Sequence, residues 1–488
     1  MMLRMDEEED EVLQVPYERR LVRRLSLTEA VTIGVGASIG AGVFTSINLA
    51  MWEAGAGSIL TFSLCSVAAL LVGYNYVKFS SVFPESGASY TYIARALKRP
   101  FIVFVSGCTL WFAYVIACST YTVGFANYFD YILNWETRQV VNFLLEANGL
   151  RSISHLVWNL VTPSCTKKIL MVTLTFIFTG LNIVGVSETG KIQTAMVVGK
   201  VLVLLFFVMV GFAEILSRPK LIFTSLQPEI VFSQFYTYYI PLLLPFKNSL
   251  WAVFSAVATV FIAFEGFDLI PTAGEELKNP KVIGRAIFIT ITSISVIYIL
   301  TLFTLLFLVP WYEAGGSEAP LAEAMRRTWL NGYGEVILVA GGVLSTASAF
   351  NATLFGASRL MYAMARERVL PERLSNLSRK ERVPYISILL ASLVSLLFAL
   401  TENLELVTSM TGVAFMLIFL LVSVSNVQLR SKTKCNVLIP IAAVVLLAIF
   451  LLSVKLYIIE AFLLLLGAIS AVYFILRKTR AKRGMKTA

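Results

Sequence analysis

Long apolar runs follow one another along this chain and leave it few ways to fold. Twelve stretches have the length of roughly 20 apolar residues that a helix needs to cross the hydrocarbon core of a bilayer. Only 14% of the 488 residues are charged, whereas soluble domains carry roughly a quarter. The sequence therefore predicts an all-α polytopic membrane protein whose solvent is the lipid bilayer. The predicted spans are residues 27–50, 57–78, 100–132, 168–186, 192–214, 249–272, 285–309, 333–363, 384–401, 405–429, 436–454 and 456–476.

Basic residues between the spans predict the orientation of the chain in the membrane. The formal charge of +10 comes mostly from Lys and Arg in alternate connections and not from one basic face, so no nucleic-acid partner is expected. Positive connections stay in the cytoplasm, and an even number of spans brings both ends to that side. We expect a multi-pass protein of the cell membrane with both termini cytoplasmic. Its tails are residues 1–26 and a basic segment, 477–488.

Few residues offer material for catalysis or metal binding. His155 is the only histidine, the five cysteines include no CxxC pair, and no HExxH motif occurs. The usual zinc sites and histidine-based hydrolase sites therefore lack their side chains. A channel would need a filter loop or rings of pore-lining residues, which are not evident. We expect no enzyme activity, no catalytic residue, no metal and no cofactor.

Two of the predicted spans contain residues that disfavour regular helix. The first carries four glycines between Gly34 and Gly42, and the sixth places Gly266 between Glu265 and Asp268 in an apolar run. Unwound backbone at membrane depth is tolerated only where protein or a polar cavity satisfies its N–H and C=O groups. Close helix packing is the alternative explanation for the glycines of the first span.

The two interruptions stand at matching places in two blocks of five spans, 27–214 and 249–429, and the last two spans follow in 436–476. Interrupted segments at corresponding places in two halves indicate the midplane site of an inverted-repeat transporter. The ends of helix fragments offer free N–H groups to a carboxylate and free C=O groups to an ammonium. A zwitterionic amino acid carries both groups. The sequence thus predicts an amino acid site between two broken helices.

At these residues the chain resembles the amino acid–polyamine–organocation (APC) transporter family. The resemblance covers roughly residues 27–430, in the family's order and spacing. It implies a LeuT-type five-plus-five inverted repeat with two added spans, which makes twelve transmembrane helices. The matching stretches are GVGASIGAGVF (34–44), PESGASYTYIARAL (84–97), VGVSETGKIQTAMVVGKVLVLLFF (184–207), FIAFEGFDLIPTAGEELKNP (261–280) and NATLFGASRLMYAMARERVLP (351–371).

The resemblance also implies where the substrate binds. Its carboxylate would meet backbone N–H groups around Ala41 and Gly42, and its α-ammonium would meet carbonyls near Ser38, Ile262 and Glu265. Three phenylalanines of the sixth span are candidate gates or pocket walls, although core packing is expected of at least one. The predicted substrate-binding residues are Ser38, Ile39, Gly40, Ala41, Gly42, Phe261, Ile262, Phe264, Glu265, Gly266 and Phe267.

Lys200 lies in the middle of the fifth span. A charged lysine at the centre of a membrane helix costs ~2.5–3.5 kcal/mol, so its presence points to a function. In some APC members a lysine here takes the place of a sodium ion. Because removal from water disfavours the charged form, we predict that Lys200 couples proton movement to transport, with Ser345 or Ser348 as neighbours. A permanently charged lysine that only supports neighbouring spans is the alternative.

Other charged residues of the spans have several possible roles. Glu265 is able to sense pH, gate the site, recognise a cationic side chain or cap free N–H groups, whereas a structural role is expected of Asp268. Glu275 and Glu276 are expected to pair with basic loop residues or to cap helices. Arg359 is expected to extend to the inner membrane interface.

These features together predict a secondary active transporter. It would carry amino acids across the cell membrane by proton symport with alternating access, and its partners would be a small-molecule amino acid, a proton and the lipid bilayer. Obligate exchange of two amino acids and a non-transporting amino acid sensor on the same fold remain open.

Overall fold

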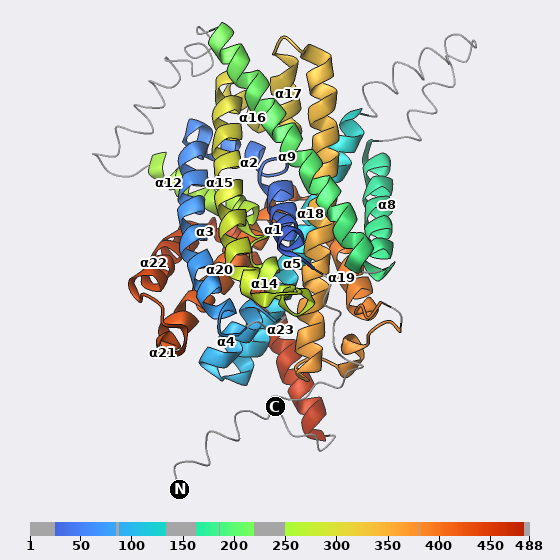
Figure 1. The fold of residues 1–488 in the computed structure, drawn as a ribbon, viewed down its shortest axis with the longest axis vertical. Helices are drawn as coiled ribbons and strands as arrows, with labels where there is room; N and C mark the ends of the chain where they lie inside the picture. Colours follow the sequence, from blue (N-terminus) through green and yellow to red (C-terminus); the bar gives the residue numbers. More distant parts are fainter. Residues whose placement is uncertain are drawn as a thin grey trace, which may run out of the picture.

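The computed structural model describes residues 25–83, 87–132, 163–184, 186–218, 249–379 and 381–482, and this part of the chain is a bundle of helices without a strand (Figure 1). Most of the predicted tails and His155 lie outside the described residues. The α-helices are α1 (Leu27–Gly42), α2 (Ile47–Ala54), α3 (Ser58–Ser80), α4 (Ser89–Leu97), α5 (Pro100–Ile132), α8 (Pro163–Val184), α9 (Val186–Ser217), α12 (Ser249–Ser255), α13 (Val257–Val260), α14 (Leu269–Thr272), α15 (Ile283–Leu308), α16 (Trp311–Gly316), α17 (Pro320–Arg326), α18 (Asn331–Arg366), α19 (Tyr385–Ala399), α20 (Leu404–Gln428), α21 (Arg430–Thr433), α22 (Leu438–Leu452) and α23 (Leu456–Lys482). Short 3₁₀ turns are η2 (Gly55–Gly57), η5 (Phe261–Phe264), η6 (Gly274–Glu276), η7 (Pro280–Val282) and η8 (Glu372–Ser375).

The helices confirm an all-α polytopic membrane protein. Within the described ranges, nine segments are long and apolar enough to cross a membrane. Three shorter apolar helices, Leu27–Gly40, Tyr385–Ala399 and Leu438–Leu452, stand at three further predicted spans. The count of twelve crossing helices and the five-plus-five repeat stay predictions.

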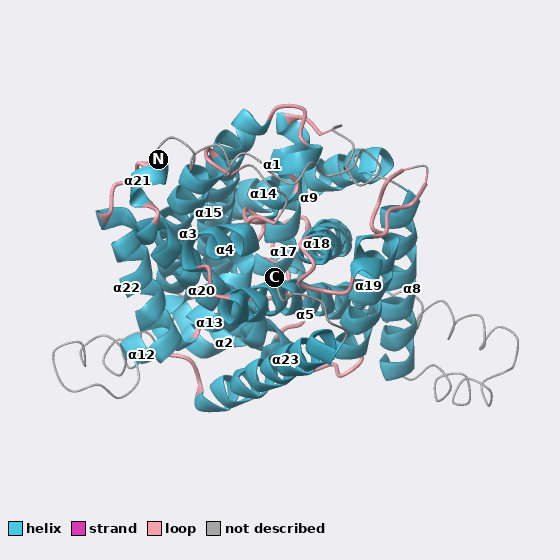
Figure 2. Ribbon diagram, turned by 90° about the horizontal axis from the view of Figure 1, so that it is seen from below, coloured by secondary structure: helices cyan, strands magenta, loops and turns pink. Residues whose placement is uncertain are grey.

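Two long helices form the centre of the bundle. α18 packs along α5 and also contacts α1, α9 and α19, and the view from below shows α5 and α18 surrounded by the other helices (Figure 2). α8 and α23 lie at the rim and expose large apolar side chains such as Phe176 and Leu464. Exposed apolar surface of this extent suits lipid contact, as expected of helices at the edge of a membrane bundle.

A short turn joins the last two helices, as the sequence requires. α22 ends at Leu452 and α23 begins at Leu456, so Lys455 lies between them. Its Nζ donates to Glu53 Oε1 at 2.6 Å and to Glu405 Oε1 at 2.9 Å. Burial alone would lower the pKa of Lys455, but these two hydrogen bonds outweigh it and raise the pKa. The lysine thus stays cationic and ties α2 and α20 to the turn.

Candidate functional site

The first broken helix is interrupted only after the last of its glycines. α1 runs as regular helix through Gly40 to Gly42, the next four residues form turns, and α2 begins at Ile47. The expectation that the glycines disturb the helix is therefore wrong for the region before Gly42. A break does follow, and it separates α1 from α2. The surroundings of Ala41 lie outside the described part.

The glycines of α1 serve close packing instead. A Cβ on Gly36 would collide with the amide of Gln193, and one on Gly40 would collide with the Cβ of Ala349. Small residues let α1 approach α9 and α18 more closely than side chains would allow. The packing explanation thus accounts for these two positions.

Hydroxyl groups satisfy carbonyls at the end of α1. The last four C=O groups of a helix have no partner within it. Ser345 donates to the carbonyl of Ile39 at 3.3 Å, and Thr45 donates to that of Gly40 at 3.5 Å. This end of the helix also carries the negative end of its dipole. The break therefore presents weakly satisfied carbonyls to the interior of the bundle.

The second broken helix is interrupted where the sequence predicts. α13 passes into η5, regular structure ends at Phe264, and α14 begins only at Leu269. Gly266 has a φ of +54°, in the left-handed region that favours glycine. A Cβ there would collide with Ser38 Oγ and the carbonyl oxygen of Gly34. The turn of the second broken helix is therefore seated directly on α1.

Two buried carboxylates flank this turn, and both are fully inaccessible to solvent. Tyr121 of α5 donates to Glu265 Oε1, and Tyr114 of the same helix donates to Asp268 Oδ2. Glu265 Oε2 and Asp268 Oδ1 have no hydrogen-bond partner among the described residues. Within the same ranges neither carboxylate has a basic group within 4 Å. Sequence reasoning missed both tyrosines, since they lie in an apolar span far from the turn.

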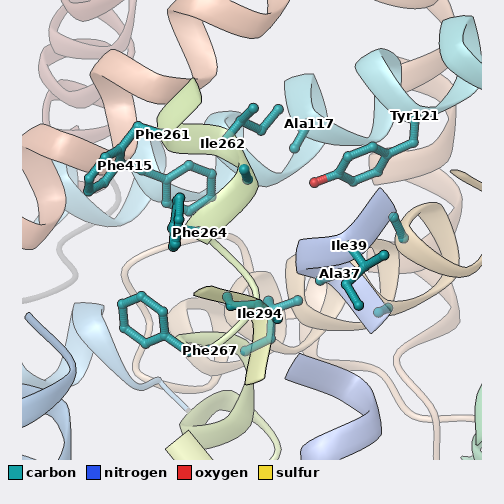
Figure 3. Packing of buried hydrophobic residues seen from close by; sticks show 14 of the residues in the cluster. Ala37, Ile39, Ala117, Tyr121, Phe261, Ile262, Phe264, Phe267, Ile294 and Phe415 are labelled. Carbon is teal, nitrogen blue, oxygen red and sulfur yellow. The ribbon is translucent and has the colours of Figure 1, made fainter. Parts of the chain in front are cut away.

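The three phenylalanines of the turn pack into the core (Figure 3). Phe261 and Phe267 lie against Phe419 of α20, with ring centroids 5.9 and 5.2 Å apart, and Phe264 lies 5.4 Å from Tyr298 of α15. All three are fully buried. These contacts agree with a packing role, and a gating role stays a prediction.

Lys200 of α9 is buried and bound to the first broken helix. Its Nζ donates to the carbonyl oxygen of Gly36 at 2.6 Å and to Ser348 Oγ at 3.1 Å. Of the two predicted neighbours, only Ser348 has this contact, while Ser345 binds α1 elsewhere. The described residues place no carboxylate within 4 Å of the ammonium group. Carbonyl and hydroxyl oxygens thus take the place of a counter-ion.

A row of buried amides continues from this contact. Gln193 Nε2 donates to Ser348 Oγ at 3.0 Å, and Asn351 Nδ2 donates to Gln193 Oε1 at 3.0 Å. Asn182 Nδ2 then donates to Asn351 Oδ1 at 2.8 Å. The row connects α8, α9 and α18 and was not predicted. The only signal for it in the sequence is the presence of amide side chains within apolar spans.

Arg359 corrects a prediction, since it does not extend to the membrane interface. The side chain is 1% exposed, its Nε donates to Glu276 Oε1 at 2.8 Å, and the guanidinium lies 3.8 Å from the centre of the Phe355 ring. Glu275 likewise pairs with Arg366, through two hydrogen bonds of 2.8 and 2.9 Å. Both glutamates therefore pair with helix α18 and not with loop residues. The arginine was placed wrongly because its partner is 83 residues away in the sequence.

Two broken helices in contact, inside a bundle of membrane-length helices, define a membrane transport protein. The sequence model of the amino acid permease family matches residues 25–483. The chain therefore belongs to the amino acid permease family, within the APC superfamily, and is a transporter and not an enzyme.

Curated relatives match over most of the chain. A branched-chain amino acid permease of Bacillus subtilis is 27% identical over 425 residues, covering 87% of this chain and 84% of the permease. A methylthioribose transporter of the same organism is 26% identical, covering 88% of this chain and 86% of that protein. Cationic amino acid transporter 4 of Mus musculus is 26% identical, covering 85% of this chain and 60% of that transporter. The named substrates differ, so similarity alone does not assign one here.

Proposed function

We propose that the chain carries amino acids across the cell membrane by proton symport with alternating access. The family supports amino acids as the class of substrate. Relatives are named for branched-chain amino acids, for cationic amino acids and for methylthioribose, so the family also accepts other solutes. We place both termini in the cytoplasm, because the basic connections favour that side.

The substrate ammonium is assigned to the carboxyl end of α1. The carbonyls of Ile39 and Gly40 accept hydroxyl hydrogen bonds of 3.3 and 3.5 Å, from Ser345 and Thr45. A cation at this end would meet both the free lone pairs and the negative end of the helix dipole. The substrate carboxylate remains assigned to backbone N–H groups near the breaks, as the family resemblance implies.

The contact of Lys200 with Gly36 is the observation that carries the coupling mechanism. The protonated ammonium binds a carbonyl of the broken helix α1 inside the membrane, and no carboxylate of the described residues lies within 4 Å of it. Release of the proton removes the charge that strengthens this hydrogen bond. Protonation of Lys200 and the position of α1 are then linked, because the protonated lysine favours the position in which α1 contacts it, and that position in turn favours protonation.

The test replaces Lys200 with alanine and follows uptake of a radiolabelled amino acid in proteoliposomes with an imposed pH gradient. We expect the wild type to accumulate substrate and the Lys200→Ala variant to lose accumulation while keeping counterflow. Lys168→Ala is the control, since that lysine is half exposed on α8. Accumulation by Lys200→Ala equal to that of the wild type would refute the coupling role.

The same vesicles separate the other modes of action. Export that stops when external amino acid is removed would identify an obligate exchanger. Binding of amino acids without uptake would identify a sensor. Either result would replace proton symport as the function.

A further inference from the structure

We propose that Glu265 selects the substrate, and that its unpaired oxygen binds the positively charged side chain of a cationic amino acid. This inference rests on the proposed amino acid transport and names the substrate class within it. Glu265 lies in the turn that interrupts the second broken helix, next to the glycine that touches α1.

The Glu265 carboxylate is only half satisfied in the described part of the chain, as is that of Asp268. Glu265 is fully buried, Oε1 accepts one hydrogen bond from Tyr121, and Oε2 has no partner in the described part of the chain. An ionised carboxylate at membrane depth without a counter-ion is strongly unfavourable. Neutral donors such as tyrosine supply hydrogen bonds but no charge. A ligand with a cationic group would supply both to Oε2.

The backbone of the turn does not need this side chain. The N–H of Glu265 donates to the carbonyl of Ile262 at 3.3 Å, and that of Leu269 donates to the carbonyl of Gly266 at 3.2 Å. The turn is further fixed by the contact of Gly266 with Ser38 of α1. Capping of free N–H groups, one of the roles expected from the sequence, thus finds no described N–H that uses Oε2.

Asp268 provides an internal comparison, because it also pairs with a tyrosine of α5. It is the residue just before the four-residue helix α14, but its side chain makes no capping hydrogen bond there. Tyr114 and Tyr121 are seven residues apart on α5, which corresponds to about 10 Å along the helix. The two carboxylates therefore bind α5 about two turns apart. Of the two, Glu265 directly follows η5, whereas Asp268 directly precedes α14.

The surroundings of Glu265 suit the aliphatic part of a long side chain. Figure 3 shows Tyr121 pointing from α5 towards the broken segment, near Ile39 of α1 and Ile262 of η5. Ile39 also carries one of the α1 carbonyls assigned to the substrate ammonium. Arginine or lysine held by its α-amino group at α1 would extend methylene groups past these apolar residues and bring its charged end towards Oε2. A neutral side chain would leave the carboxylate buried without a counter-ion.

Arginine and citrulline are the substrates that test this inference, since they have nearly the same shape and differ in charge. Uptake of each radiolabelled compound is measured in proteoliposomes at equal concentration. We expect the wild type to favour arginine by about 30-fold or more, as buried charge pairs usually discriminate. Glu265→Gln should remove the preference by lowering arginine uptake to the level of citrulline uptake, and thermal unfolding in detergent shows whether the variant is folded. Asp268→Asn is the matched control and should keep the preference.

Three outcomes would overturn the assignment of Glu265. Equal transport of arginine and citrulline by the wild type would refute charge selection. An equal loss of arginine and citrulline uptake in Glu265→Gln would mean that Glu265 binds the α-ammonium group common to both substrates, or the proton. Loss of the preference for arginine in Asp268→Asn would mean that the turn as a whole, and not Glu265 alone, selects the substrate. Absence of uptake and binding for all amino acids would refute the proposed function instead.

Discussion

At the scale of single residues, the buried pair of Arg359 and Glu276 fixes the segment that follows the second break. Both side chains are almost inaccessible, so neither charge is stabilised by water when the other is removed. Breaking such a pair costs about 3–5 kcal/mol, because one buried charge remains unpaired. We predict that Arg359→Gln lowers the free energy of unfolding by about this amount, and that adding Glu276→Gln recovers part of the loss.

A thermal unfolding series in detergent measures this coupling. The control pair is Arg368 and Glu372, whose side chains are 77% and 56% exposed. A surface pair of this kind contributes about 0–1 kcal/mol, so Arg368→Gln should shift the unfolding midpoint little. Equal midpoint shifts for Arg359→Gln and Arg368→Gln would contradict the prediction.

The sequence identified a functional candidate only where a residue was chemically unusual for its span, such as a charge within an apolar helix. Lys200 was found as a charge within an apolar helix, and the adjacent Ser348 was found with it. Tyr121 and Gln193 were not found, since a tyrosine or an amide is unremarkable in a helix until its partner is known. Their partners Glu265 and Ser348 lie 144 and 155 residues away in the sequence. Such contacts follow from the tertiary fold and not from local pattern.

At the scale of helices, the approach of α1 to α18 depends on Gly40. An added Cβ would collide with the Cβ of Ala349 and lie 2.8 Å from the carbonyl oxygen of Ser345. Backbone of α18 cannot rotate away as a side chain does, so the helices must separate. We predict that Gly40→Ala lowers the free energy of unfolding by about 1–3 kcal/mol, as overpacking usually does.

Gly180 of α8 is the matched control for this substitution. Apart from its own stretch of helix, no described atom lies within 4 Å of the position of its added Cβ. Alanine favours helix over glycine by about 1 kcal/mol, so Gly180→Ala should leave thermal stability unchanged or raise it. The prediction fails if both variants unfold at the same temperature, because the loss would then not come from the α1–α18 contact.

The sequence predicted that the segments are helical more accurately than it predicted where the helices end. Apolar runs predicted helices throughout, and the carboxylates around Gly266 located the second interruption correctly. The first interruption was placed too early, since glycine both weakens a helix and permits close packing. Contacts with Gln193 and Ala349 favour the second effect and extend α1 to Gly42. The sequence contains no information that decides between the two before the neighbours are known.

At the scale of the whole molecule, each broken helix continues into a short segment that ion pairs hold in place. Glu53 of α2 binds Lys455, which also binds Glu405. After the second break, η6 binds α18 through Glu276 and Arg359. In the proposed cycle of alternating access, these contacts must open in turn, since a transporter open at both ends would leak. Both sets of contacts are formed in this structure.

The pairing of Leu25 with Leu277 allows a direct test of this movement. The bridge joins the residue before α1's cap to the segment that follows η6, with the N–H of Leu25 donating to the carbonyl of Glu276 at 2.9 Å. Both side chains are buried. Cysteines at the two positions have the separation of paired backbone segments, which suits a disulfide. We predict that oxidation of Leu25→Cys/Leu277→Cys stops amino acid uptake and that reduction restores it.

The cross-linking experiment requires a background in which the exposed native Cys165 is replaced by serine. Each single cysteine variant, oxidised in the same way, is the control and should transport as before. A cross-linked protein that still transports at the uncross-linked rate would mean that this end of the bundle does not open. The broken helices would then have to move at the end held by Lys455 alone, and alternation between two faces would lose its physical basis.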